Sequence, residues 1–149
     1  MPIIFADRLR GEYILTSDQS RISITKIHHW LSTEAYWALG RSREEVVESI
    51  EHSNLYAVVT ADGQTVACAR MITDQLTFGW VGDVFVDGEH RGRGLATWMV
   101  GEIVDYWIGA GVRRVLLATR DAHEVYARVG FSALAQPELF MEIDRRSAG

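Results

Sequence analysis

The stretch WVGDVFV (residues 80–86), DGEHRGRG (87–94) and LATWMVGEIVDYWI (95–108) decides how the rest of the chain is interpreted. It predicts a strand, a short loop that carries cations and glycines, and a long apolar helix. Gly92 and Gly94 can adopt backbone angles that other residues avoid, and they leave their amides uncovered. The helix presents free N–H groups and the positive end of its dipole at its start. With the guanidinium groups of Arg91 and Arg93, this junction predicts a phosphate-binding site.

Two better-known phosphate loops do not fit this stretch. A Walker loop needs GxxxxGK followed by Ser or Thr; no such run occurs, and Lys26 is the only lysine in the chain, so a P-loop NTPase is excluded. The dinucleotide fingerprint GxGxxG is half met by residues 92–97, where Thr97 replaces the third glycine. About twenty residues further on, where an acidic partner for the ribose is expected, stand Arg113 and Arg114. A dinucleotide-dependent reductase is therefore kept only as a third hypothesis.

A different pair of motifs fits better. The string RGRGLA (residues 91–96) follows a strand that ends in VFV (84–86), and LLAT (116–119) precedes an AxxxYxxxGF string (122–131). In this order and spacing the two motifs resemble the acyl-CoA pyrophosphate loop and the strand–helix–strand ending of the GNAT superfamily of N-acetyltransferases. The resemblance covers roughly residues 55–143 well and the first fifty residues only loosely.

Length and composition indicate that residues 1–149 form a single globular domain. A chain of 149 residues can bury about two thirds of its surface on folding, and 48% hydrophobic with 23% charged residues is ordinary for such a domain. The net charge of −5 and the lack of a basic run longer than two residues argue against a nucleic-acid partner. The positive charge at residues 90–93 is local and suits a small anionic ligand.

The single Cys68 excludes an internal disulfide and a cysteine-based metal cluster. None of the five histidines forms a ligand pair with carboxylates, so we expect no metal site. The first apolar residues are interrupted at once by Asp7 and Arg8, so no signal or membrane segment is expected, and a cytoplasmic location follows as an expectation.

The first half of the chain predicts a short strand at Tyr13–Leu15, followed by helices. Apolar residues recur at helical spacing from Ile22 to Leu31, and residues 35–39 predict a further short helical turn that ends at Gly40. Ser42 and Glu45 form a capping box that opens a helix ending near Ser53.

Strand patterns follow. Residues 55–60 and 65–72 flank an Asp62-Gly63 turn and predict a hairpin. Residues 77–86 predict a long strand, in which Gly79 and Gly82 indicate a bulge or the close approach of a ligand. We expect a deeply packed helix over residues 95–108, ended by 109–111, and a strand at 115–118.

The last segment predicts a helix and two strands. Asp121 and Glu124 can cap the helix, and Gly130 closes it as the C′ residue. The final strands are expected at 131–133 and 140–143, with Gln136-Pro137 between them.

The order of these elements predicts an α/β fold with a mixed, mostly antiparallel sheet and helices on both faces. The crossover helix after Val86 implies that the strand at Val115 lies parallel to the one at Val84. The GNAT resemblance implies the same order, with the parallel pair splayed at the cofactor site.

The resemblance implies acetyl-CoA as cosubstrate and assigns its contacts. Backbone of three strand residues would pair with pantetheine, and an N–H near the end of the strand would face the thioester oxygen, a contact often worth about 3 kcal/mol. Loop and helix amides would bind the pyrophosphate. The cofactor-binding residues are thus Val84, Phe85, Val86, Arg91, Gly92, Arg93, Gly94, Leu95, Ala96 and Thr97.

Tyr126 is the expected catalytic acid, because it occupies the tyrosine position of the family string and could protonate the leaving thiolate. The alternative is that it is a core aromatic, since Ala122, Val125, Tyr126 and Val129 form a helical stripe.

Asp83 is the expected general base, because members of this family often place a carboxylate or a water-holding residue just before the cofactor-binding backbone. It could equally be a buried polar group paired with its neighbours, and transfer through ordered water without a base stays open. Cys68 lies between Ala67 and Ala69 and is interpreted as a small core residue rather than a nucleophile.

The acceptor is expected to be an amine, on a small molecule or a peptide. Trp30, Tyr36 and Trp37 with Glu34 suggest an aromatic-walled site for a cationic amine, although such aromatics are more often core or interface residues. We expect an N-acetyltransferase that works by direct attack in a ternary complex, with a homodimer among its expected assemblies. The runner-up is a non-catalytic acyl-CoA-binding or regulatory module on the same fold.

Overall fold

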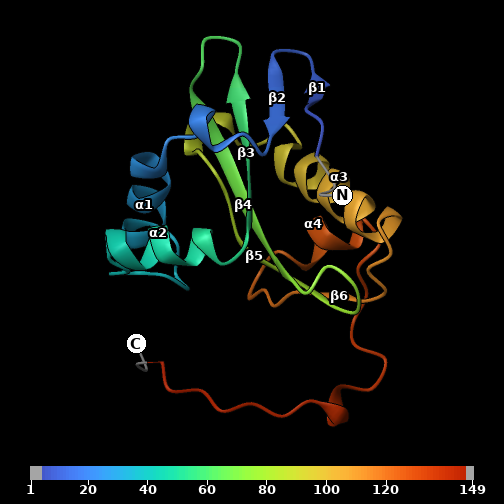
Figure 1. Cartoon of the computed structure of the whole chain (residues 1–149). Coiled ribbons are helices and arrows are strands. Elements are labelled where there is room, and N and C mark those ends of the chain that lie inside the picture. The colour runs from blue at the N-terminus through green and yellow to red at the C-terminus, as the bar shows by residue number, and fades with distance from the viewer. Residues whose placement is uncertain (1–4, 147–149) are drawn as a thin grey trace.

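The computed structural model describes residues 5–146, and in these residues six strands form one sheet in the order β1-β2-β3-β4-β5-β6 (Figure 1). Neighbouring strands are antiparallel except for β5 and β6, which are parallel. The mixed, mostly antiparallel sheet predicted from the sequence is confirmed. The strands are β1 (Arg8–Arg10), β2 (Tyr13–Thr16), β3 (Asn54–Thr60), β4 (Thr65–Thr73), β5 (Gly79–Val86) and β6 (Val115–Leu116).

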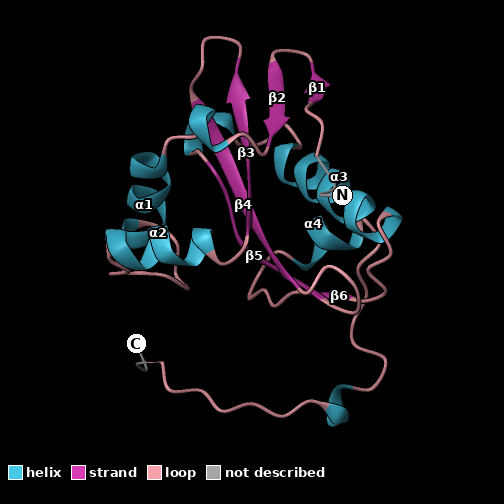
Figure 2. Cartoon of the chain, viewed as in Figure 1, coloured by secondary structure: helices cyan, strands magenta, loops and turns pink. Residues whose placement is uncertain are grey.

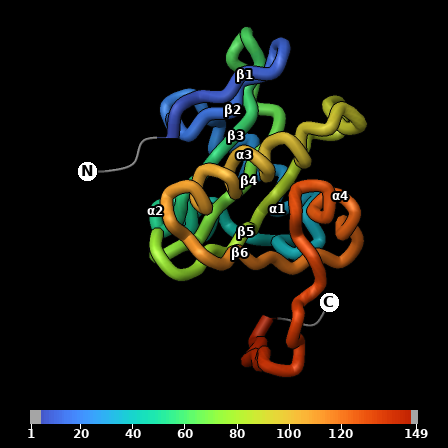
Figure 3. The backbone as a smooth tube through the Cα atoms, turned by 90° about the vertical axis from the view of Figure 1, so that its right-hand side faces the viewer, coloured from blue at the N-terminus to red at the C-terminus, as the bar shows by residue number. Residues whose placement is uncertain are grey.

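Helices cover both faces of the sheet. On one face lie α1 (Ile24–Thr33) and α2 (Arg43–Glu51), and on the other lie α3 (Leu95–Gly109) and α4 (His123–Ala127) (Figure 2). Figure 3 shows α3 running across the front of the sheet with α4 beside it. The side chains of Ser23 and Ser42 cap α1 and α2 by accepting the N–H of the residue three positions on, as the Ser42 capping motif predicted.

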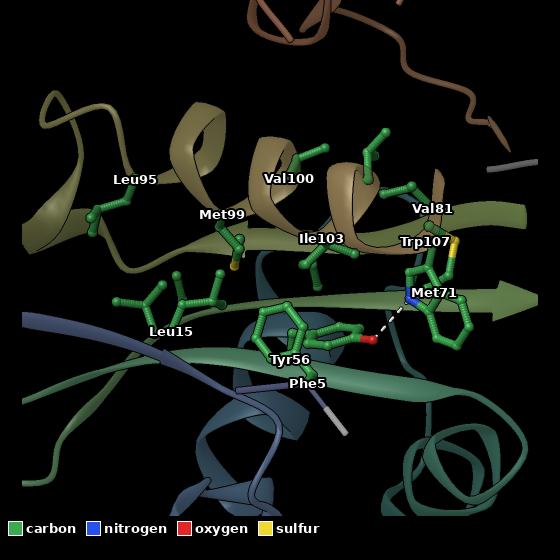
Figure 4. Close-up of a cluster of buried hydrophobic side chains, with 14 of the residues drawn as sticks. Phe5, Leu15, Tyr56, Met71, Val81, Leu95, Met99, Val100, Ile103 and Trp107 are labelled. Carbon is green, nitrogen blue, oxygen red and sulfur yellow. Dashed lines mark hydrogen bonds between the residues drawn. The ribbon is translucent and has the colours of Figure 1, made fainter. Parts of the chain in front are cut away.

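Each layer has its own apolar core. Under α3, the fully buried Met99 and Ile103 pack onto the sheet, and the indole N–H of Trp107 donates to the Tyr56 hydroxyl at 2.9 Å (Figure 4). On the other face Ile27, Leu31 and Val46 of α1 and α2 pack against Ala57, Cys68 and Phe85. The helix over residues 95–108 is therefore as deeply packed as its nearly all-round apolar pattern predicted.

A bulge interrupts the pairing of β4 with β5. Arg70 pairs with Gly82 and Cys68 pairs with Phe85, so β5 advances three residues while β4 advances two. The glycines of this strand predicted such a bulge, but the residue with left-handed backbone is Asp83, at φ 51°. Upstream of the bulge Val81 packs toward α3, whereas downstream of it Phe85 packs toward α1 and α2.

The parallel pair separates soon after it forms. β5 and β6 pair only through Gly79 with Val115 and Trp80 with Leu116, and no pairing follows along either strand within residues 5–146. β6 is therefore two residues shorter than the predicted strand at 115–118. From Val81 onward, the edge of β5 that faces away from β4 has no strand beside it among the residues that the structure describes.

The structure corrects the sequence predictions at several places. Residues 35–39 form a single hydrogen-bonded turn, with Ala38 N–H donating to Ala35 O at 3.0 Å, and no regular helix; Gly40 takes the left-handed conformation that ends the segment. Asp121 does not cap α4, because the N-cap is Ala122, whose own N–H is accepted by the Thr119 hydroxyl at 3.0 Å. The short strand β1 was not predicted, since three residues carry too little pattern.

The predicted final strands at 131–133 and 140–143 are wrong. Within residues 131–146 the chain forms only a 3-10 turn at Pro137–Leu139 (red in Figure 1). This segment contacts the rest of the molecule at Phe140, whose ring lies 5.1 Å from the Arg114 guanidinium, and Arg146 at its end lines the cleft described below. Its alternating apolar side chains suit a strand, but they meet no sheet edge: Met141 is 97% exposed and Ile143 89%. A strand pattern becomes a strand only where another strand accepts its hydrogen bonds.

Candidate active site

A cleft of about 1020 Å³ opens where β5 and β6 separate. One wall is β5 from Trp80 to Val86, and the opposite wall is the segment 117–122 that follows β6. Tyr126 of α4 and the segment between α1 and α2, which includes Tyr36, Trp37 and Arg41, add to the lining. The other residues that line the cleft are Arg70, Arg91, Ala96, Val125 and Arg146. The fold therefore brings both sequence motifs to one cavity.

The β5 side chains beyond the bulge are engaged in packing, which leaves the backbone edge to face the cleft. Phe85 is 7% exposed and stacks on Trp30, with ring centroids 5.3 Å apart. Val84 and Val86 pack on the α3 side. β4 pairs with one edge of this segment, while the other edge has no strand partner among the described residues. Such an edge can accept an extended ligand as an added strand.

The loop after β5 forms an open cradle at the start of α3. Gly92 and Gly94 have φ of 79° and 73°, which only glycine adopts at little cost, and a Cβ at Gly92 would meet nothing within 4 Å. Gly94 is the N-cap and provides no side-chain cap. The first hydrogen bond of the helix runs from Trp98 N–H to Gly94 O at 3.0 Å, so the N–H groups of residues 95–97 precede it and need other acceptors.

Three arginines surround this cradle. Arg91 Nε donates to Val86 O at 2.9 Å, and its guanidinium lies 5.1 Å from the Phe85 ring. Arg93 Nη1 donates to the Tyr13 hydroxyl at 2.6 Å. Arg10 of β1 was missed from the sequence, because β1 itself was missed; its Nη1 donates to Gly94 O at 3.1 Å. The loop is exposed, its own arginines are held by β2 and β5, and β1 contributes Arg10, an arrangement that suits an anion-binding site.

Tyr126 lies in the cleft wall and keeps its proton at neutral pH. Burial raises the pKa of Tyr126 to about 12, and the nearby Tyr36 and Asp121 add to the shift. The ring contacts Phe131 edge to face, with centroids 6.0 Å apart. Tyr126 is thus packed like a core aromatic residue, and it also lines the cleft, as a catalytic acid must.

Asp83 is held by three side chains from two other segments, the one between α1 and α2 and the strand β4. Its Oδ1 accepts the indole N–H of Trp37 at 2.8 Å, and its Oδ2 accepts Arg41 Nη1 at 2.9 Å and Arg70 Nε at 3.0 Å. Sequence reasoning missed both arginines. One signal existed for Arg70, a cation in an otherwise apolar strand, but nothing local marked Arg41.

The remaining candidate groups take structural positions. Cys68 is buried, its thiol donates to Asp83 O at 3.4 Å, and burial raises the pKa of that thiol well above its usual range, so it is a core residue rather than a nucleophile. Among residues 5–146 there is no cluster of His, Cys, Asp or Glu that could hold a metal ion. No described helix is long and apolar enough to cross a membrane.

The aromatic residues proposed for the acceptor site divide into two groups. Trp30 is buried and does not line the cleft, whereas Tyr36 and Trp37 do. The ring of Tyr36 already contacts a cation of the protein itself, because the Arg120 guanidinium lies 3.8 Å from its centroid. The Tyr36 hydroxyl accepts the backbone N–H of Arg120 at 2.9 Å. Trp37 directs its N–H to Asp83. The aromatic wall therefore binds the protein's own groups.

Comparison with known proteins shows what this architecture is. A model of the acetyltransferase (GNAT) family matches residues 24–131, which is most of the chain. The chain belongs to the GNAT family of acetyltransferases. It is therefore an acyl-CoA-dependent acetyltransferase, and its family uses acetyl-CoA.

Similar proteins agree with this membership. A crystal structure from Xanthomonas campestris pv. campestris, itself assigned to the GNAT family, superposes with a TM-score of 0.83 at 39% identity, over 89% of this chain and 92% of that one. A Gibberella zeae protein, provisionally assigned as an acetyltransferase, is 26% identical over 80% of this chain and 78% of its own length. N-acetylglutamate synthase from Neisseria gonorrhoeae, in complex with coenzyme A and N-acetyl-glutamate, shares the fold: the TM-score is 0.69 at 20% identity, over 87% of this chain and 30% of that one.

Proposed function

We propose that this protein transfers the acetyl group of acetyl-CoA to a primary amine, on a small molecule or a peptide, by direct attack in a ternary complex. One juxtaposition carries this proposal. The unpaired edge of β5 leads into an exposed glycine cradle at the start of α3, and a protonated phenol lies in the wall of the same cleft.

The residues around the cradle fit the cosubstrate. Backbone N–H groups from Arg91 to Thr97 would hold the pyrophosphate, helped by the helix dipole and the neighbouring guanidinium groups. The open backbone of residues 84–86 would hold pantetheine, and an N–H near Phe85 or Val86 would donate to the thioester oxygen. Acetyl-CoA supplies the acetyl group as an activated thioester.

Tyr126 is proposed as the general acid. The neutral amine attacks the carbonyl carbon, a C–N bond forms, and the C–S bond breaks. The thiolate then takes the proton of the Tyr126 hydroxyl, while the amine's surplus proton passes to water and finally restores the phenol. A phenol whose pKa lies near 12 does not ionise at neutral pH and so can donate in every turnover.

Two roles were predicted for Asp83, and its contacts favour the structural one. The carboxylate already accepts three hydrogen bonds, two of them from guanidinium groups, so about one of its roughly four acceptor positions is left to take a proton from the amine. We therefore propose that the amine loses its proton to ordered water, and that Asp83 positions the two arginines.

Thiol release with an amine panel tests this proposal. Wild-type protein should release CoA from acetyl-CoA only when an amine acceptor is present, and Tyr126→Phe should bind acetyl-CoA with unchanged affinity but turn over slowly. Tight binding of acetyl-CoA without turnover of any amine would instead support the alternative, a non-catalytic acyl-CoA-binding module.

A further inference from the structure

The cleft wall at the bulge of β5 carries more positive than negative charge. Asp83 is a single carboxylate shared by two guanidinium groups, those of Arg41 and Arg70. The three side chains are 7%, 22% and 14% exposed, respectively, so they have lost most of their water. Buried charge is costly unless it is paired, and one of the two cations has no carboxylate of its own.

The two arginines differ in the donors they have left. Arg70 is tied into the fold, because its Nε donates to Asp83 and its Nη1 donates to Ser49 O at 3.3 Å and to Ser53 Oγ at 3.2 Å. Arg41 donates only through Nη1, to Asp83, and its Nε and Nη2 meet no acceptor within residues 5–146. Arg41 also lines the cleft. Asp83 thus fixes Arg41 through Nη1 and leaves the N–H groups of Nε and Nη2 available to bind a ligand.

The position of Arg41 separates it from the phosphate cradle. Asp83 precedes residues 84–86 in β5, whereas the glycine loop follows them at residues 91–94. The two cationic sites therefore lie at opposite ends of the segment where the thioester is proposed to lie. Pyrophosphate at the glycine loop would leave Arg41 with only its share of the Asp83 carboxylate.

The other charges of the cleft do not satisfy Arg41. Asp121 pairs with Arg120 at 3.5 Å, and Asp83 is already shared. Glu34 is the one lining carboxylate that has no guanidinium partner within residues 5–146, and it provides an attraction for the ammonium form of an arriving amine.

We infer that the acceptor is an amine that also carries an anionic group, a carboxylate or a phosphate, and that the Arg41 guanidinium binds this group. The inference rests on the proposed N-acetyl transfer and names its substrate class. A planar guanidinium matches the oxygens of carboxylate and phosphate with two parallel hydrogen bonds, which an ammonium cannot do.

The test uses matched acceptor pairs that differ only in the anion: α-amino acids and their amides, and phosphoethanolamine and ethanolamine. With wild-type protein and saturating acetyl-CoA, the anionic member of at least one pair should have a kcat/KM about 10- to 100-fold higher, as expected for hydrogen bonds to a charged group. The two kinds of pair distinguish carboxylate from phosphate.

Arg41→Gln should remove this preference by raising KM for the anionic member, with the Kd of acetyl-CoA unchanged. Arg41→Lys should restore only part of it, because lysine lacks the fork. Arg43→Gln is the matched control, since Arg43 lies two residues away and outside the cleft, where it donates to Thr25 Oγ1. It should leave every parameter at the wild-type value.

A binding measurement separates the two proposals. Calorimetric titration of the N-acetyl amino acids and of their amides, in the presence of CoA, reports the anion site without turnover. Equal kcat/KM within every pair, or a preference that survives in Arg41→Gln, overturns the inference while N-acetyl transfer stands. Absence of any acetylation, with N-acetyl amino acids still bound through Arg41, overturns the proposed function and leaves the anion site.

Discussion

Removing the Asp83 carboxylate should destabilise the protein more than almost any other single polar change. The side chain is 7% exposed and accepts from two guanidinium groups and one indole. Breaking a buried ion pair from one side costs about 3–5 kcal/mol. Arg41 and Arg70 retain some water, so the lower part of this range applies, and Asp83→Ala should lose about 3 kcal/mol of the free energy of unfolding.

The backbone at this position provides a second, opposite term. Asp83 has φ 51°, a conformation that costs a residue with a Cβ roughly 1–2 kcal/mol and glycine almost nothing. Asp83→Gly should therefore lose only about 2 kcal/mol, despite removing the same carboxylate. Asp83→Asn keeps an oxygen for Trp37 and tolerates this backbone, so it should also lose about 2 kcal/mol.

Urea denaturation followed by tryptophan fluorescence measures these values, with the m-value checking that each variant unfolds as one unit. The order Asp83→Ala more destabilised than Asp83→Gly is the diagnostic result. If Asp83→Gly proves the less stable of the two, or if Asp83→Ala loses under 1 kcal/mol, the account of the bulge and its cation pair is refuted.

Other predictions concern the cosubstrate site, the core and the C-terminal segment. Tyr126→Phe should lower kcat about 100-fold, and this factor should be the same at every pH from 7 to 10, because a pKa near 12 keeps the phenol protonated throughout. A ratio of wild-type to variant kcat that falls toward one above pH 8 would contradict this role. Gly94→Val should abolish the thermal shift caused by acetyl-CoA, because φ 73° is closed to valine. If circular dichroism shows that this variant is unfolded, Gly92→Ala takes its place in the same assay. Met99→Ala should lose about 2–5 kcal/mol in urea denaturation, and a loss under 1 kcal/mol would contradict the packing under α3. Truncation after Ser132 should change Tm by less than about 3 °C, and a larger drop, or a change of mass in light scattering, would show that the segment pairs with a strand of this chain or of a second copy.

Local chemistry predicted the elements that carry the motifs. The Asp62-Gly63 turn, the apolar period of α3 and the glycines before it depend on neighbouring residues only, and each was predicted from the sequence. The parallel arrangement of β5 and β6 followed from the same elements, since a crossover helix brings the next strand back in the same direction.

Contacts between distant residues were not predictable in this way. Arg41 and Asp83 are 42 residues apart, and Arg10 and Gly94 are 84 apart, so no spacing rule joins them. Asp83, the expected general base, lies between two guanidinium groups, and only the placement of the segment between α1 and α2 against the sheet reveals this. The strands predicted in the C-terminal segment were wrong for the converse reason. The strand pattern depends on neighbouring residues, but a strand also needs a hydrogen-bonding partner, which a distant part of the chain must provide.

The extra residue in β5 exchanges the faces to which odd- and even-numbered side chains point before and after the bulge. If β5 continued past Gly82 with strict alternation and no bulge, Phe85 would turn toward α3 and the two flanking valines toward α1, and the peptide groups that face β4 would exchange places with those that face the open edge. A single-residue insertion after the bulge would cause this exchange and should therefore be tolerated far less than one in the turn at residues 61–64, even though both lie a few residues from a strand end.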